Sequence, residues 1–147
     1  MALGAKFNAV LADTNPPNIT DVYQSPPADH VNSTDTVKVF ANVTDDLSGV
    51  RQVVLNYTID GSAPYSVVMS NLQGNKYNAT IPAFAHGTHV TYVVVAEDFA
   101  NNSITTQNIG YDYDYDVIPE LPASLLLLVF MIATLLSVIV YRRSRAR

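Results

Sequence analysis

The sequence predicts an all-β fold, a seven-stranded β-sandwich over residues 18–110, followed by one C-terminal transmembrane helix. Short segments of alternating apolar and polar residues recur there between turn signals, which is typical of a sandwich. Residues 121–141 carry no charge, and no other segment shows a convincing helical period. Because the chain has no cysteine, a domain in it must depend on its hydrophobic core.

Six strands follow from the alternation, and a seventh is expected after a turn at 97–101. We expect the six over residues 19–24, 36–44, 50–59, 65–70, 76–81 and 88–96, with a turn over 71–75 between the fourth and fifth. Every second residue of the longer strands is apolar and should face the core. The predicted core includes Val39, Leu55, Tyr57, Tyr92 and Val94.

Other segments flank the predicted sandwich. Residues 1–12 are a candidate for the last strand of a preceding domain, and the proline-rich residues 13–17 read as a linker. Aspartate and tyrosine alternate over 111–116, so residues 111–120 form either the extended end of the last strand or a stiff acidic stalk. We favour the C-terminal part of a longer surface protein over a chain that inserts by its last helix alone.

The uncharged run has the length of a membrane anchor. As a helix, residues 121–141 would span about 30 Å, the thickness of the hydrocarbon core of a bilayer. Four arginines follow it, so the positive-inside rule places the tail, 142–147, in the cytoplasm and residues 1–120 outside. We therefore expect a single-pass protein of the plasma membrane. A buried helix of a soluble domain is the alternative, but such helices are seldom this uniformly apolar.

Charge and motifs exclude several classes of function. Residues 1–120 hold all 13 acidic residues against four basic ones, a net charge of −9, which argues against a nucleic-acid partner. The chain has no nucleophile elbow and no glycine-rich phosphate loop. His86 and His89 lack the further ligands of a zinc site. We expect no enzymatic activity.

Asn-x-Ser/Thr sequons are frequent in this chain. Three of the six fall on outward-facing strand positions, as a glycan requires, although Asn and Ser/Thr are also ordinary residues of turns and strands. The candidates for glycosylation are Asn18, Asn32, Asn42, Asn56, Asn78 and Asn101.

Acidic residues gather in loops that a sandwich of this order places at one end. Asp45, Asp46, Glu97 and Asp98 offer the hard oxygen ligands that Ca²⁺ prefers. The alternative is that they only form turns. Calcium is the one cofactor that the sequence suggests.

Three segments resemble the immunoglobulin-like or fibronectin type III-like repeat of prokaryotic surface proteins. They are Asp-Thr-Asn-Pro-Pro-Asn-Ile at 13–19, Val-Thr-Asp-Asp-Leu-Ser-Gly-Val at 43–50 and Val-Ala-Glu-Asp-Phe-Ala-Asn-Asn at 95–102. The resemblance implies a sandwich of that type and neighbouring repeats joined at such a linker. Pro119, Glu120, Leu121 and Pro122, with the apolar run and the arginines, resemble archaeal sorting signals that an archaeosortase reads. Leu121 stands where that signal has phenylalanine.

The sequence thus favours a membrane-anchored module of the cell surface with a structural, spacer or adhesion role. Its expected partners are the bilayer and, outside, other surface proteins or glycans. The alternative is a sugar- or peptide-binding accessory module of a surface enzyme or transporter. An exposed aromatic platform would support that alternative, and Phe40, outward on the second strand, is its one clear candidate.

Overall fold

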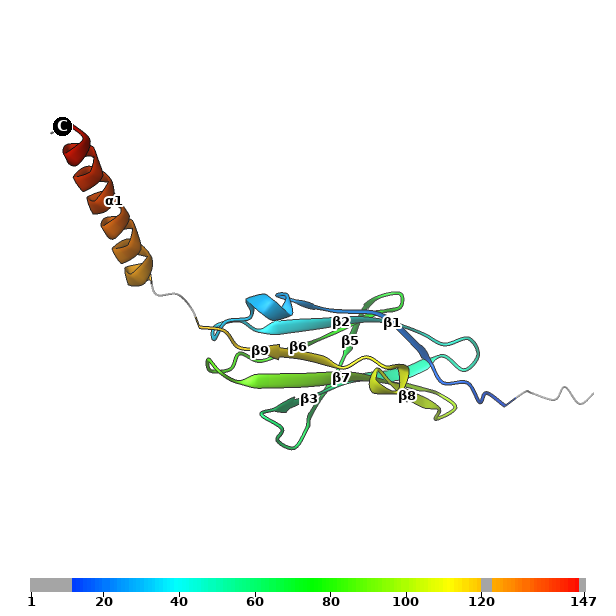
Figure 1. The fold of residues 1–147 in the computed structure, drawn as a ribbon. Coiled ribbons are helices and arrows are strands. Elements are labelled where there is room, and N and C mark those ends of the chain that lie inside the picture. Colours follow the sequence, from blue (N-terminus) through cyan, green and yellow to red (C-terminus); the bar gives the residue numbers. More distant parts are fainter. Residues whose placement is uncertain (1–11, 120–122, 146–147) are drawn as a thin grey trace, which may run out of the picture.

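Two antiparallel sheets pack face to face in the computed structural model, which describes residues 12–119 and 123–145 (Figure 1). The first sheet has the order β1-β2-β6-β5, and the second has β4-β3-β7, with β8 and β9 both paired to β7. The strands are β1 Asn18–Ser25, β2 Val37–Thr44, β3 Val50–Ile59, β4 Tyr65–Val68, β5 Ser70–Gln73, β6 Lys76–Ile81, β7 His89–Asp98, β8 Ser103–Thr105 and β9 Tyr113–Asp116. The helices are the 3₁₀ turns η1 Ala28–His30 and η2 Gln107–Ile109, and α1 Ala123–Arg145.

This strand order is that of the immunoglobulin fold. In that fold strands A, B, E and D form one sheet, and strand C, its neighbour C′, F and G form the other. Here β1, β2, β6 and β5 take the first set of places, and β4, β3, β7 and β8 with β9 take the second. The structure therefore confirms an all-β sandwich with immunoglobulin-like topology.

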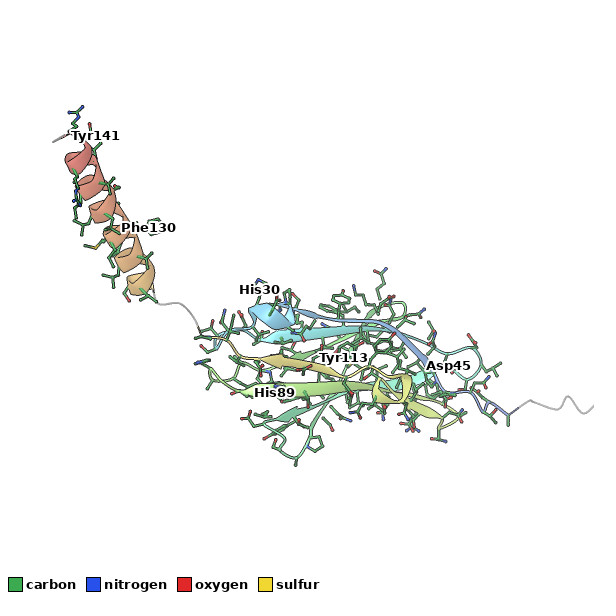
Figure 2. All side chains as sticks on the ribbon, viewed as in Figure 1. His30, Asp45, His89, Tyr113, Phe130 and Tyr141 are labelled. Atoms are coloured by element: carbon green, nitrogen blue, oxygen red, sulfur yellow. The ribbon has the colours of Figure 1, made fainter. Side chains whose placement is uncertain are left out.

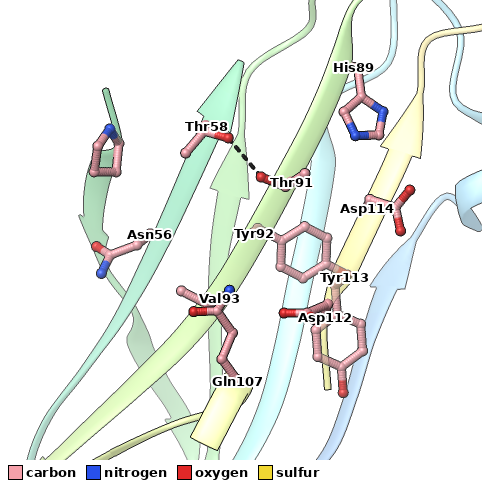
Figure 3. Close-up of a pocket in the computed structure, with 11 residues that line it drawn as sticks. Asn56, Thr58, His89, Thr91, Tyr92, Val93, Gln107, Asp112, Tyr113 and Asp114 are labelled. Atoms are coloured by element: carbon pink, nitrogen blue, oxygen red, sulfur yellow. Dashed lines mark hydrogen bonds between the residues drawn. The ribbon is translucent and has the colours of Figure 1, made fainter. Parts of the chain in front are cut away.

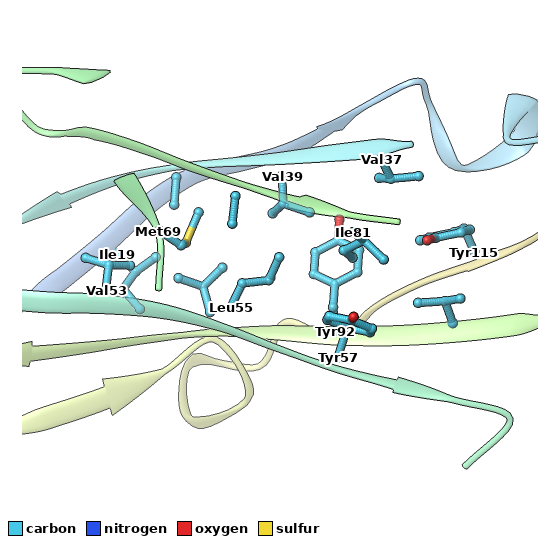
Figure 4. Packing of buried hydrophobic residues seen from close by; sticks show 14 of the residues in the cluster. Ile19, Val37, Val39, Val53, Leu55, Tyr57, Met69, Ile81, Tyr92 and Tyr115 are labelled. Carbon is cyan, nitrogen blue, oxygen red and sulfur yellow. The ribbon is translucent and has the colours of Figure 1, made fainter. Parts of the chain in front are cut away.

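The predicted alternation is correct in the long strands. β3 and β6 have the predicted bounds, and the buried side chains of β2, β3 and β7 occur at every second residue. Val39, Leu55 and Val94 have no exposed surface, and Tyr57 and Tyr92 are also buried (Figure 4). These five residues belong to one cluster that both sheets share.

The sandwich has nine described strands rather than the predicted seven, and one cause is a crossing between the sheets. The predicted strand 65–70 is correct for β4, which ends at Val68 and pairs with β3. Most of the predicted turn 71–75 is wrong, because Ser70–Gln73 forms β5, which pairs with β6 in the other sheet. Met69 lies between the two strands, is buried, and its amide donates to the carbonyl of Val53 at 2.8 Å. A single inward apolar residue between exposed short strands gave no period to detect.

The other cause is an interruption of the last strand. β8 ends at Thr105, the chain loops out through η2, and β9 then returns to β7. Buried Thr106 fixes the break, since its amide donates to the carbonyl of Val94 at 3.0 Å and its Oγ1 accepts from the Val94 amide at 3.2 Å.

An acidic stalk over 111–120 is therefore wrong, and the alternative, an extension of the last strand, is what the structure shows. Tyr113 and Tyr115 face the core, and Tyr115 is only 3% exposed. The aspartates between and after them face solvent, so the alternation of tyrosine and aspartate is that of a strand with one buried face.

The chain enters and leaves the sandwich at opposite ends (Figure 1). Residues before β1 lie beside the β2–β3 loop, where the Ser48 amide donates to Asp13. At the other end, Ile118 follows β9 and its amide donates to the carbonyl of Val31 at 2.8 Å.

A C-terminal helix is present, as predicted, and its described side chains are exposed. Among the residues that the structure describes, no helix is both long enough and apolar enough to cross a membrane. Residues 1–11, which hold most of the expected strand of a preceding domain, lie outside the described residues.

Candidate functional site

A groove of about 510 Å³ on the outer face of the second sheet is the first candidate site (Figure 3). β3, β7 and β9 supply its floor, and η2 supplies a wall where the last strand is interrupted. The volume falls within the usual range of small-ligand sites. Its polar lining residues are Asn56, Thr58, His89, Thr91, Gln107, Asp112 and Asp114.

Hydrogen bonds hold part of the floor in place. The hydroxyls of Thr58 and Thr91, which are cross-strand partners, lie 2.7 Å apart. The Oδ1 atom of Asn56 accepts from the hydroxyl of Ser66 on β4 at 2.7 Å.

Carboxylates set the charge of the groove. His89 Nδ1 lies 2.8 Å from Asp116, and this hydrogen bond, with the nearby charges of Asp116, Asp114 and Asp60, raises the pKa of His89. Among the described lining residues, only His89 can carry a positive charge. The groove is therefore acidic and rich in hydrogen-bonding groups. The groove could not be predicted from the sequence, because it depends on the break between β8 and β9.

The structure brings two of the four predicted calcium ligands together. Asp45 and Asp98 meet Asp13, and one carboxylate oxygen from each lies within 4.8 Å of the others. Glu97 instead forms an ion pair with Arg51 on the outer face of the second sheet. Asp46 is exposed and is not part of the cluster. Asp13 was not predicted because it belongs to the linker, and the sequence does not show that the linker packs beside these loops.

These carboxylates also close the loops that carry them. Asp45 Oδ1 accepts from the Gly49 amide at 2.6 Å. The side chain of buried Asp98 accepts from the Asn102 amide at 2.8 Å and from its Nδ2 at 2.7 Å. Hydrogen bonding to Ser48 lowers the pKa of Asp13. Each of these carboxylates thus has a role in closing a loop. Calcium binding stays a prediction.

The sequons divide unequally between the two sheets. Asn18, Asn42 and Asn78 lie on the outer face of the first sheet, and Asn56 lies on that of the second. Asn32 and Asn101 are in loops, where Asn32 Oδ1 accepts from the Thr34 amide at 2.9 Å. Their glycosylation also stays a prediction.

Phe40 is part of an aromatic pair on the first sheet. Its ring stacks on that of Tyr23, its cross-strand partner on β1, with centroids 4.8 Å apart and planes inclined by 15°. Tyr23 is 45% exposed. The Nζ atom of Lys76 lies 5.3 Å from the Phe40 centroid and 5.4 Å from that of Tyr23.

Of the four residues of the sorting-signal candidate, the structure describes Pro119, which is exposed. Glu120, Leu121 and Pro122 lie outside the described residues.

Comparisons with known proteins add little to this geometry. No protein-family model matches the chain, and no curated protein matches its sequence. A solved structure titled "Crystal structure of Br derivative BhCBM56" is similar at a TM-score of 0.44 and 13% identity, over 66% of this chain and 99% of that one. Murine CRIg is similar at a TM-score of 0.40 and 15% identity, over 73% of this chain and 100% of that one. Likeness at this level carries no inference about function.

Proposed function

We propose that this chain is a cell-surface spacer module, which its C-terminal apolar segment anchors in a membrane. The observation that carries the proposal is the position of the chain ends. The chain enters the sandwich at one end and leaves it at the other, directly before the uncharged segment (Figure 1). A module of this kind holds whatever precedes it at the full length of the sandwich from the surface that the segment occupies.

The apolar segment needs a nonpolar environment. Leu127, Phe130 and Val140 are 63%, 64% and 67% exposed, and apolar side chains of α1 face solvent all along it (Figure 2). Burial of one such side chain is worth about 1.5–3 kcal/mol, so the segment gains strongly from a lipid phase. The proposal rests on the whole run 121–141, part of which lies outside the described residues.

Membrane extraction tests the anchor. The full chain should stay with the membrane fraction after a carbonate wash, whereas a chain that lacks residues 119–147 should be released. A second variant, Phe130→Arg combined with Leu135→Arg, keeps the length of the chain but places charges inside the apolar run. It should also be released, because each charge at the membrane centre is costly. Release of the full chain, or retention of both variants, would contradict the anchor.

The groove supports a second function, binding of a sugar. Amide, hydroxyl and carboxylate groups converge on it from β3, β7, η2 and β9, and such groups match the hydroxyls of a saccharide. This function belongs to an accessory module that presents a sugar to a partner enzyme or transporter.

Titration of the full chain in detergent with neutral oligosaccharides, followed by NMR, tests this second function. Amide shifts should concentrate at Thr91 and Val93, and Asp114→Asn should weaken binding several-fold. Thr80→Ala, on the other sheet, should leave it unchanged. Shifts spread over both sheets, or none, would remove sugar binding from the account.

A further inference from the structure

The outer face of the first sheet carries a stacked aromatic pair among polar residues, of which Tyr23 is exposed and Phe40 is half-buried. Tyr23 on β1 and Phe40 on β2 stack across the strands, and Tyr23 is 45% exposed. The neighbouring outward positions are polar: Lys38, Asn42, Lys76, Asn78 and Thr80. An apolar pair of this size on a polar face loses free energy to water unless something covers it.

The strand order places a sequon beside the half-buried Phe40 ring, on the β6 side, where Lys76 also lies. Tyr23 covers one side of the ring, because the two planes are nearly parallel at a centroid distance of 4.8 Å. β6 lies on the other side of β2, and the residue directly opposite Phe40 on β6 is Asn78. Directly opposite residues of an antiparallel pair have Cβ atoms about 4.5–5.5 Å apart.

Asn78 is also free to be modified. Thr80, the hydroxyl residue of its sequon, is exposed on the same face. No hydrogen bond to another described residue holds the Asn78 side chain, whereas Nδ2 of Asn42, the other sequon beside Phe40, donates to Asp21 at 2.8 Å. A glycan on Asn42 would have to break that bond, so Asn78 is the better placed of the two.

We propose that Asn78 carries an N-linked glycan whose first sugar residues pack against the accessible part of the Phe40 ring and the exposed rim of Tyr23. The C–H groups on one face of a pyranose are apolar, and their contact with an aromatic ring removes apolar surface from water. Lys76, beside the pair, is placed to donate to sugar hydroxyls. The glycan thereby covers the aromatic pair of Tyr23 and Phe40 and stabilises the first sheet. The inference rests on the outside location of the sandwich in the proposed function.

The test uses the full chain from a host that N-glycosylates proteins. Mass spectrometry should find a glycan on the peptide that contains Asn78. Asn78→Gln should lower Tm by about 4 °C, the shift that a modest contact gives in a domain of this size. The same loss should be absent when Phe40 is already replaced by threonine, since the sugar then has no ring to contact. Asn18→Gln, at the far edge of the same face, is the matched control and should lower Tm equally with and without Phe40.

NMR gives a second readout that a general effect of glycosylation would not produce. Sugar protons above the ring should be shifted upfield in the Asn78-glycosylated chain and should return to ordinary positions in Phe40→Thr. An unmodified Asn78 on a chain whose other sequons carry glycans would overturn the proposal, whereas a chain without any glycan would overturn the outside location on which it rests. So would an Asn78 glycan whose stabilisation and proton shifts are the same in Phe40→Thr.

Discussion

The two outer faces of the sandwich share one core but differ in chemistry. The first sheet carries three sequons, and two of them, Asn42 and Asn78, lie beside the stacked rings of Tyr23 and Phe40. On the second, a single sequon, Asn56, borders an acidic groove. The inward residues of both sheets pack into the same core, so they are apolar on both sheets. The outward residues take no part in that core, and their chemistry therefore indicates what each face contacts.

We therefore read the first sheet as the covered face and the second as the free one. A glycan on the first sheet would prevent protein contacts there. The groove on the second sheet lies beside the interruption of the last strand, where the chain forms η2 before β9 pairs with β7. The largest expected effect on stability comes from a substitution in the core that both sheets share.

Leu55→Ala should lower the free energy of unfolding by about 2–5 kcal/mol, because Leu55 has no exposed surface and the change leaves a cavity. Val54→Thr, at the preceding residue of β3 and on the outward parity, should cost well under half of that. Chemical denaturation of both variants checks the difference. Equal losses at the two positions would mean that β3 is buried on both faces, and that the second sheet is not free.

The acidic cluster at the end where the chain enters the sandwich either only closes its loops or also binds a cation. Three carboxylates within 4.8 Å repel one another, and a cation that binds only the folded chain would relieve this. At 100 times its dissociation constant, Ca²⁺ should add about 2.7 kcal/mol, which raises Tm by several degrees. Thermal melts in EDTA and in millimolar Ca²⁺, at matched ionic strength, measure this shift.

Asp45→Asn should abolish the rise, and Asp46→Asn, outside the cluster, should preserve it. An unchanged Tm in Ca²⁺ would leave Asp13, Asp45 and Asp98 as residues that only close loops.

Two buried tyrosines of the second sheet differ in how they meet the first. The Tyr92 hydroxyl donates to Gln24 Oε1 on β1 at 2.9 Å, whereas the buried Tyr115 hydroxyl has no hydrogen-bond partner among the described residues. Tyr92→Phe should cost about 0.5–1.5 kcal/mol, and Tyr115→Phe should be neutral or stabilising. Denaturant midpoints of the two variants decide the matter; a larger loss at Tyr115 would show that its hydroxyl is satisfied.

The smallest expected effect is at the rim of the groove. The hydrogen bond to Asp116 raises the pKa of His89, so this pair adds stability that is fully present below the ordinary histidine pKa of about 6.5. That contribution is lost as pH rises through the pKa of the folded state. An NMR titration should place the pKa of His89 above its usual value, and Asp116→Asn should lower it. An unchanged pKa in that variant would show that the pair does not form in solution.

The sequence predicted those parts of the fold that repeat an alternation. The bounds of β3 and β6 followed from it, because each buries one face and exposes the other. The crossing at Met69 did not, since one buried residue between two exposed strands makes no pattern. The Tyr–Asp repeat was visible but left two interpretations open, and only its pairing with β7 decides between them.

The same limit applies to the sites. Asp45 and Asp98 could be placed together, because alternate loops of a sandwich lie at one end. Asp13 could not, since its position depends on the path of the linker. The groove depends on a buried threonine, Thr106, that stops one strand and starts a loop, and such an event has no signature in sequence.

The most direct test of the membrane-anchored module uses the absence of cysteine from the chain. Ser62→Cys places a thiol at the exposed tip of the β3–β4 hairpin, and Ser144→Cys places one among the C-terminal arginines. A membrane-impermeant maleimide should label the first variant on intact cells and label the second only after the membrane is opened. Labelling of both variants on intact cells, or of neither until the cells are opened, would contradict the account.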